Sequence, residues 1–404
     1  MKIAQLSALS AAILLATSAQ ANSFVDDSSL NIELRNYYKH TTTDTGAKDS
    51  NDQWAQGIRV DYSSGYFENV VGVDLGAYYS LKLGASADSD VGLLMKDGDN
   101  AKSYGKNAYS IKFNLADMGV LKYGRMFLNL PLLNDSDSRV LPSLTEAFYG
   151  NVSYEGLTAH AAWAKKGNSK TQSGFENYGT DEEKEPVKTV GAAYDFGNGM
   201  TLAADYATQA DAAKKYLIEA TFATEMEGTT LNFAANYGKV SAIGAAKDAQ
   251  GTGDTSQNAF GVKVGANLGS ASLGLAYTKV KDTTLGSYED SWTGGEDSTG
   301  HFGYNASQIS DFDARGQKAW GIKAGYDFSE MVPGLNASAK YVKGSYEGGD
   351  ENEYNIDVMY AVPQLEGLSA RLRYAKNTND QDNVADDKIT TDSRVIVQYK
   401  VSVF

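Results

Sequence analysis

Five arginines are the residues with the clearest potential for chemistry, because each shares one face of an expected β-strand with polar neighbours. Arg35 and Arg59 lie near the start of the chain, and Arg371, Arg373 and Arg394 near its end. A guanidinium group is always charged and offers planar paired donors, which suit a carboxylate or a phosphate. Several weak contacts along one wall would let a small anion move on without being trapped. We therefore expect these arginines to form a basic strip that guides anions.

The segment 126–144 is the second candidate, because it changes abruptly from apolar to polar. Leucines at positions 128, 130, 132 and 133 precede a run of acids and serines. Such leucines would not remain in external water, so we expect this loop to fold inward and narrow the passage. The polar residues expected at the constriction are Arg125, Asp135, Ser136, Asp137, Ser138 and Arg139. The longer loop 281–316, with Tyr288, Trp292, Glu296, Asp297 and Tyr304, is the candidate for the opposite lip.

Alternation of polar and apolar residues predicts the strands that position these side chains. In the last of them, Val395, Val397 and Tyr399 have one parity while Arg394 and Gln398 have the other, so one face suits lipid and one suits water. We expect about eighteen strands of this kind. They cover residues 28–38, 53–62, 69–83, 104–115, 120–125, 145–154, 157–165, 187–196, 200–208, 214–225, 229–239, 257–268, 270–280, 317–328, 334–344, 353–362, 367–376 and 391–403.

Short and long connections between these strands alternate. The short ones lie at 117–119, 155–156, 198–199, 226–228 and 364–366, and the long ones at 39–52, 84–103, 126–144, 166–186, 240–256 and 281–316. This rhythm predicts an all-β protein, a transmembrane antiparallel up-and-down β-barrel with short periplasmic turns and long extracellular loops. Closure of the barrel would make the four arginine-bearing strands neighbours.

The first residues indicate where the barrel belongs. Lys2, an apolar stretch and the sequence Ala19-Gln20-Ala21 are typical of a secretory signal peptide over residues 1–21. We expect cleavage near Ala21 and a single barrel domain over 22–404. A run of about 18 apolar residues, as a membrane helix needs, does not follow. The expected location is the outer membrane of a Gram-negative cell.

Composition excludes several classes of function. The net charge of −15 argues against nucleic-acid binding, which selects basic faces. Cysteine is absent, so stability must come from strand pairing and burial. The mean hydropathy of −0.39 suits a barrel in which only alternate strand residues face lipid. No cofactor is expected.

The residues argue against several alternatives to a channel. An outer-membrane hydrolase would need a nucleophile beside a histidine, but only His40, His160 and His301 occur and no hydrolase motif accompanies them. Asp135 and Asp137 resemble the start of a calcium loop, yet Arg139 takes the next ligand position, so no metal site is expected. A secreted β-sandwich would alternate similarly but without the rhythm of loops. Arg35 and Arg59 have a structural alternative, which is pairing with Glu33 and Asp61.

Several segments resemble the OprD family of substrate-specific porins. They are residues 24–38, 128–142, 320–341, 371–375 and 394–404, spread from end to end. The resemblance implies an eighteen-stranded barrel, a constriction set by the third and seventh loops, and a basic ladder for carboxylate-bearing solutes such as amino acids, peptides or aromatic acids. Arg35, Arg371, Arg373 and Arg394 lie in matching segments, while Arg59 and Arg125 match less closely. Some relatives take up chitin oligosaccharides, so a sugar-selective pore or a general diffusion pore remains the alternative.

The expected partners follow from this interpretation. They are small-molecule solutes, outer-membrane lipid and lipopolysaccharide, and the barrel-assembly machinery during insertion. The protein would be a monomer or a trimer.

Overall fold

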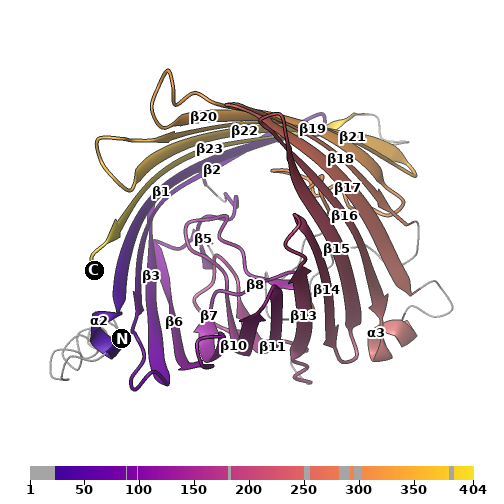
Figure 1. Cartoon of the computed structure of the whole chain (residues 1–404). Helices are drawn as coiled ribbons and strands as arrows, with labels where there is room; N and C mark the ends of the chain where they lie inside the picture. The colour runs from indigo at the N-terminus through magenta and orange to yellow at the C-terminus, as the bar shows by residue number, and fades with distance from the viewer. Residues whose placement is uncertain are drawn as a thin grey trace.

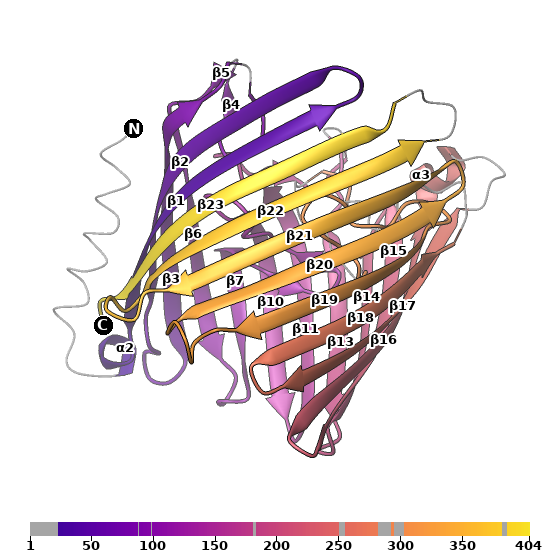
Figure 2. The same ribbon diagram turned by 90° about the horizontal axis from the view of Figure 1, so that it is seen from above.

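The chain forms a closed antiparallel β-barrel in the computed structural model (Figures 1 and 2). The structure describes residues 23–87, 89–97, 99–180, 183–249, 255–281, 292–294, 303–381 and 386–404. The main sheet has 19 strands, one of which, β12, is only two residues long. The other strands form the barrel wall, so the predicted fold class is confirmed. Among the described residues, none of the helices is long and apolar enough to cross a membrane.

The wall strands follow one another in chain order. They are β1 (Ser29–Asp44), β2 (Lys48–Ser63), β3 (Val71–Ala85), β6 (Ser103–Asn114), β7 (Gly119–Met126), β10 (Leu144–Tyr154), β11 (Leu157–Asn168), β13 (Val187–Asp195), β14 (Met200–Gln209), β15 (Ala213–Met226), β16 (Thr229–Ala242), β17 (Ser256–Leu268), β18 (Ala271–Val280), β19 (Lys318–Asp327), β20 (Leu335–Tyr346), β21 (Gly349–Ala361), β22 (Leu368–Gln381) and β23 (Lys388–Ser402). The short elements are α2 (Ser23–Asp26), β4 (Lys96–Asp97), β5 (Asp99–Asn100), β8 (Asn129–Leu130), β9 (Leu133–Asn134), β12 (Glu176–Asn177) and α3 (Gly244–Ala249).

Strand β1 closes the barrel by pairing with both β2 and β23. Arg35 lies opposite Gly57 of β2 on one side and Gln398 of β23 on the other. Strand β22 pairs with β23 so that Arg373 is directly opposite Arg394. The strands that carry the five arginines are therefore adjacent, as the closure argument predicted.

The two faces of the wall differ as a transmembrane barrel requires. Along β19, Trp320 and Ile322 are exposed on the outer face. The alternate residues Ala319 and Gly321 are buried on the inner face. Exposed aromatic side chains stack between neighbouring strands, as in the Phe148 contact with Trp163 and that of Tyr123 with Phe148. Outer apolar side chains face lipid, and the alternate residues face the lumen.

Tight turns connect the strands at the end where the chain enters and leaves the barrel. Glu155-Gly156 and Glu227-Gly228 have positive φ at both central positions, with Gly156 at 84° and Gly228 at 76°. This is the geometry of a type I′ turn, whose twist matches that of paired strands, and glycine adopts it without steric cost. By the usual orientation of such barrels, this end is periplasmic and the opposite end is extracellular.

Two extracellular connections differ from the sequence prediction. The prediction of a long loop over 39–52 is wrong, because β1 continues to Asp44 and β2 begins at Lys48. Likewise β20 and β21 extend until only Glu347 and Gly348 separate them. These strand ends are polar on both faces, so they lack the alternation by which strands were recognised. Backbone pairing continues beyond the membrane without it.

Two loops fold into the barrel instead of outward, and β5 and β8 lie inside it (Figure 1). The leucine-rich loop after β7 buries its four leucines against the lumenal faces of β10, β11, β13 and β14. Leu132 and Leu133 are fully buried. The loop between β3 and β6 packs Leu93 and Leu94 against Val140 and Leu141 and the wall near Tyr37. Apolar burial therefore fixes the loops that narrow the lumen.

The indole of Trp292 fastens a second segment to this loop. Its Nε1 donates a hydrogen bond of 3.0 Å to the carbonyl of Leu132, and the ammonium of Lys215 lies 4.3 Å above its ring. Of the residues predicted for the opposite lip, Tyr288, Glu296 and Asp297 lie outside the described residues. Trp292 and Tyr304 are described, and both contact other parts of the protein.

The buried leucines provide a test of loop anchoring. Leu132→Ala removes a fully buried side chain, and such a change costs about 2–5 kcal/mol of packing. We expect the loop to loosen, which would increase the fluctuations of single-channel current and lower the melting temperature of the purified barrel. Leu372→Ala is the matched control, because that side chain is 54% exposed on the outer face. Equal effects of both substitutions would contradict the anchoring role.

Candidate functional site

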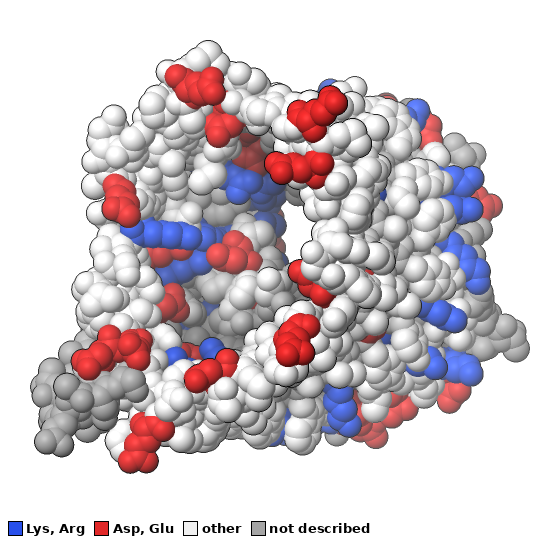
Figure 3. Space-filling view, viewed as in Figure 1, with Lys and Arg blue, Asp and Glu red and all other residues white. Residues whose placement is uncertain are grey.

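The predicted arginines all lie on the inner face of four adjacent strands. β22 carries Arg371 and Arg373, β23 carries Arg394, β1 carries Arg35 and β2 carries Arg59. Figure 3 shows Lys and Arg side chains on the inner wall with Asp and Glu side chains among them. The wall is therefore a band of paired charges, and the availability of each arginine depends on its partners.

Asp137 joins Arg35 and Arg59 to the folded-in loop. Its Oδ1 is 2.9 Å from one terminal nitrogen of Arg35 and 2.7 Å from one of Arg59, and its Oδ2 accepts a second hydrogen bond from Arg35 at 3.1 Å. Glu33 contributes from the wall, with Oε1 at 2.9 Å from Nε of Arg35. One loop carboxylate thus bridges two wall strands.

Backbone carbonyls of the loop occupy the remaining donors. Arg59 donates to the carbonyl of Val140 through Nε at 3.0 Å and a terminal nitrogen at 2.6 Å. Arg35 donates to the carbonyl of Arg139 at 2.6 Å. Both arginines also pair with Glu33, which was the structural alternative for them. The other predicted partner, Asp61, accepts a 2.5 Å hydrogen bond from Tyr78. Arg35 and Arg59 hold the loop in place more than they face the passage.

The pKa of Asp137 reflects this bridge. Burial by itself would raise that pKa, but the hydrogen bond and positive charge of Arg59, together with Arg35, outweigh it and hold the pKa below its ordinary value. The carboxylate is therefore charged at neutral pH, and the bridge is intact there.

Arg394 anchors the segment that precedes β19. It makes a bidentate pair with Asp392 at 2.7 and 2.8 Å and donates to the carbonyl of Gln308 at 3.3 Å. The Gln308 amide in turn donates to the Asp392 side chain at 3.0 Å. The guanidinium is buried, so Arg394 is a third arginine that positions a loop.

Glu353 of β21 holds the same segment through three backbone amides. The N–H groups of Gln308, Ile309 and Ser310 donate to its carboxylate at 2.9, 3.1 and 2.9 Å. Lys340 of β20 donates to the carbonyls of the two preceding loop residues, 305 and 306. Successive amides that converge on one carboxylate make a rigid anchor.

Arg371 and Arg373 differ from the other three because they remain open to the lumen. Both pair with Asp357 of β21, which accepts from Arg371 in a bidentate contact and lies 3.3 Å from Nε of Arg373. Their side chains are 43% and 25% exposed. Two guanidinium groups thus share one carboxylate and keep free donors.

Two cavities meet at these two arginines. The smaller, of about 130 Å³, also involves Arg35, Asp137 and Ser138, and so lies at the narrowing made by the folded-in loop. The larger, of about 420 Å³, extends along β17 to β22 under residues 304–308. Arg371 and Arg373 line both, so a solute moving between the cavities passes them.

Three lysines that were not among the predicted site residues also line the larger cavity, namely Lys263, Lys323 and Lys340. Lys263 lies 5.0 Å above the ring of Tyr304. Burial and a 2.6 Å hydrogen bond to Glu219 raise the pKa of Tyr304, so the phenol stays neutral. The alternation of the sequence could have identified these lysines, because each lies between residues that face outward, as the arginines do.

The predicted constriction residues separate into different roles. The prediction that Asp135 faces the lumen is wrong, because its side chain is buried. The carboxylate accepts hydrogen bonds from the N–H of Leu128 at 2.8 Å and from the hydroxyl of Thr145 at 3.1 Å. It closes the turn that carries the leucines. Ser136 accepts or donates a 3.0 Å hydrogen bond with Ser138. Ser138 lines the smaller cavity, and Arg139 folds back on the Ser138 carbonyl.

Arg125 lies outside the lumen, which corrects its predicted place at the constriction. It shares the outer parity of Leu121 and Tyr123, pairs with Glu146 at 3.0 Å and lies over the rings of Tyr109 and Phe175. Strand β7 continues to Met126, so Arg125 still follows the alternation of that strand.

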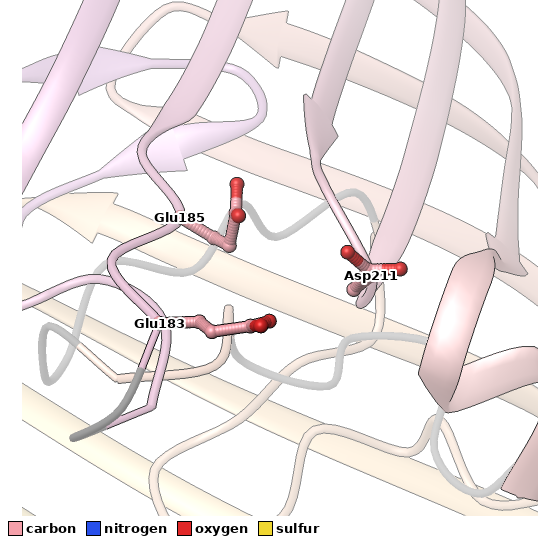
Figure 4. Close-up of side chains that lie close together, drawn as sticks. All are labelled: Glu183, Glu185 and Asp211. Carbon is pink, nitrogen blue, oxygen red and sulfur yellow. The ribbon is translucent and has the colours of Figure 1, made fainter.

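Three carboxylates gather next to the extracellular ends of β13 and β14. Oxygen atoms of Glu183, Glu185 and Asp211 lie within 4.8 Å of one another (Figure 4). Exposed acidic groups of this kind are common without an ion. We assign no metal site to them.

The Asp137 bridge makes a prediction for ion selectivity. Asp137→Asn removes the negative charge between Arg35 and Arg59, so anion permeability relative to cation permeability should rise in planar bilayers. Because the pKa of Asp137 is lowered, the bridge contributes fully above the ordinary aspartate pKa of about 4 and is lost only as pH falls through the lowered value. Wild-type selectivity should therefore stay constant from pH 7 to about 5. Glu366→Gln, in a periplasmic turn, is the control, and an unchanged ratio in Asp137→Asn would reject the bridge.

The Glu353 anchor predicts a different phenotype. Glu353→Ala leaves three backbone N–H groups without their acceptor, so residues 308–310 should detach from the wall. We expect noisier single-channel currents with an unchanged barrel, measured in bilayers and by the heat-dependent gel mobility of the protein. Glu347→Ala, at the exposed tip of the β20–β21 hairpin, is the control. Quiet currents in Glu353→Ala would show that other contacts suffice.

Comparison with known proteins places the chain in a family. The family model described as outer membrane porin, OprD family, matches residues 22–403. Porin D of Pseudomonas aeruginosa is 28% identical over 422 residues, which cover 95% of this chain and 93% of that protein. The Porin-like protein GalP of Pseudomonas putida is 24% identical, with 95% and 94% covered.

Solved structures share the fold. Pseudomonas aeruginosa OccK9 (OpdG) has a TM-score of 0.82 at 24% identity, with 95% of this chain and 100% of that chain covered. Acinetobacter baumannii OccAB2 has a TM-score of 0.82 at 22% identity, with 95% and 100% covered. Pseudomonas aeruginosa OpdK, solved with vanillate, has a TM-score of 0.80 at 23% identity, with 94% and 100% covered. The chain therefore belongs to the OprD family of outer membrane porins, which are channels of the outer membrane and not enzymes.

Proposed function

We propose that this porin passes small solutes that carry a carboxylate, and that Arg371 and Arg373 hold that carboxylate in transit. The observation that carries the proposal is the difference among the five arginines. Three are occupied by loop groups, whereas these two remain partly exposed where the two cavities meet. A solute carboxylate can bind them by the same paired hydrogen bonds that Asp357 makes.

The shared counter-ion keeps this station weak. Asp357 neutralises one of the two positive charges and competes with a solute for their donors. A partly neutralised pair attracts an anion without holding it, which passage requires. Lys263 and Lys323 continue the positive lining into the larger cavity, so an anion that leaves the arginines meets further cations.

A relative supports the choice of solute class. OpdK was solved with vanillate, and vanillate is a carboxylate on an aromatic ring. This chain has Tyr304 and Lys263 together in its larger cavity, which suits a flat ring beside a cation. Aromatic carboxylates are therefore the first solutes to test, followed by amino acids and short peptides.

The double substitution Arg371→Gln with Arg373→Gln tests the station. In a liposome-swelling panel we expect the influx of aromatic carboxylates to fall about fivefold or more, because charged hydrogen bonds are lost. Neutral sugars of similar size, including chitooligosaccharides, should change by less than about twofold. Lys48→Gln, at the tip of the β1–β2 hairpin, removes one positive charge elsewhere and serves as the control.

Two outcomes would contradict the proposal. An equal loss for carboxylates and sugars indicates a general diffusion pore, and faster sugar than carboxylate influx in the wild-type protein indicates a sugar-selective one.

A further inference from the structure

We propose that the outer wall of the barrel binds the phosphate groups of glycolipid in the outer leaflet of the membrane. The binding surface is a row of outward-facing basic side chains at the extracellular ends of the strands, which we call the outer basic row. Its members are Arg125, Lys165, Lys188, Lys214, Lys239, Lys279, Lys318, Lys343 and Lys376. The proposal is independent of what the channel transports.

The strand register places these side chains on the lipid-facing side. Directly opposite residues of paired strands project to the same face. Five lysines of the row lie opposite an exposed outer aromatic residue. The pairs are Lys188 with Trp163, Lys239 with Tyr216, Lys279 with Phe260, Lys343 with Trp320, and Lys376 with Tyr354.

Burial of the alternate residues confirms the direction. Thr278 and Val280 flank Lys279 and are buried, as are Val342 near Lys343 and Ala375 before Lys376. In Figure 3, Lys and Arg side chains recur along the outer wall at the right of the view. The row therefore stands just beyond the aromatic side chains, where a membrane protein meets lipid headgroups.

The row occurs on one side of the membrane only. Among the described residues, no lysine or arginine faces outward in the periplasmic half of a wall strand, and the described periplasmic turns carry acids such as Glu68, Asp117, Glu227, Glu330 and Glu366. Electrostatic attraction to anionic headgroups acts only near the surface that holds them. The asymmetry fits a leaflet rich in phosphate on the extracellular side.

Two lysines of the row lie side by side and have no carboxylate partner among the described residues. Lys279 of β18 and Lys318 of β19 are directly opposite each other, and both are exposed. Like charges at this spacing destabilise a sheet. Neither lysine makes an ion pair with a described residue.

The lumen shows how this chain treats such a pair elsewhere. Lys112 of β6 and Lys122 of β7 are also directly opposite, and Asp74 lies between them at 2.9 and 2.7 Å. The inner pair has a carboxylate from its own chain. We infer that the outer pair receives its anion from the lipid, as a phosphate held between two ammonium groups.

Lys165 shows the kind of site that results. Its ammonium lies over the outer rings of Phe148 and Trp163, at 5.0 Å from each, and 5.7 Å from Tyr123. The rings suit the sugar and acyl parts of a glycolipid, and the ammonium suits its phosphate.

The experiment compares the binding of two glycolipids by the full-length protein. Purified protein is titrated in detergent with bis-phosphorylated lipid A and with the same glycolipid after removal of its phosphates, and bound lipid is counted by native mass spectrometry. We expect wild type to bind the phosphorylated form about tenfold or more tightly. Lys279→Gln with Lys318→Gln should lose most of this preference, while Lys388→Gln with Lys400→Gln, an equal loss of charge at two positions with the lumenal parity of Arg394, should keep it.

Several results would overturn the proposal. They are equal binding of the two glycolipids by wild type, an unchanged preference in Lys279→Gln with Lys318→Gln, and a change only in oligomeric state, which would identify a second copy as the occupant. Heat-dependent gel mobility verifies that each variant is folded. If Lys279→Gln with Lys318→Gln does not fold, Lys343→Gln with Lys376→Gln is the second variant, with the same expected loss.

Discussion

The pairing of β1 with β23 is the constraint on which the passage depends. Backbone groups in lipid must be satisfied within the protein, so the sheet has to close. Closure brings residues from the two ends of the chain to one wall, with Arg373 opposite Arg394 and Arg35 beside Gln398. The charged band exists only because the barrel is closed. Its polar side chains are tolerated there because alternate residues of every strand face water.

Charge pairing then divides the arginines by function. A buried charge is costly unless it is paired and hydrogen-bonded. Arg35, Arg59 and Arg394 meet that requirement through loop carbonyls and through Asp137 and Asp392, and in doing so they fix the loop after β7 and the segment that precedes β19. Arg371 and Arg373 are partly exposed to water, so their donors can exchange one partner for another. The same physical requirement therefore produces rigid loop anchors and open stations on one wall.

The two faces of the wall treat lysine in different ways. Inside, the Lys112 and Lys122 pair has Asp74 as its partner, and Lys340 donates to loop carbonyls. On the outer face, Lys279 and Lys318 lie opposite each other and are exposed at the level of the lipid headgroups. Because side chains alternate between the two faces of a strand, neighbouring charges on one strand lie in two environments. One faces the solutes in the lumen and the other faces the lipid.

The sequence by itself determined the strands, their two faces and the lumenal position of the five arginines, because a period of two residues is a local property. It also indicated that the leucines of the loop after β7 are buried. It did not determine which charges pair, that Asp135 closes a turn, that Arg125 faces outward, or that the predicted loop 39–52 is a hairpin. Those features depend on contacts between residues far apart in the chain, such as Arg35 with Asp137. Only the closed tertiary structure brings such partners together, and it decided which arginines remain open.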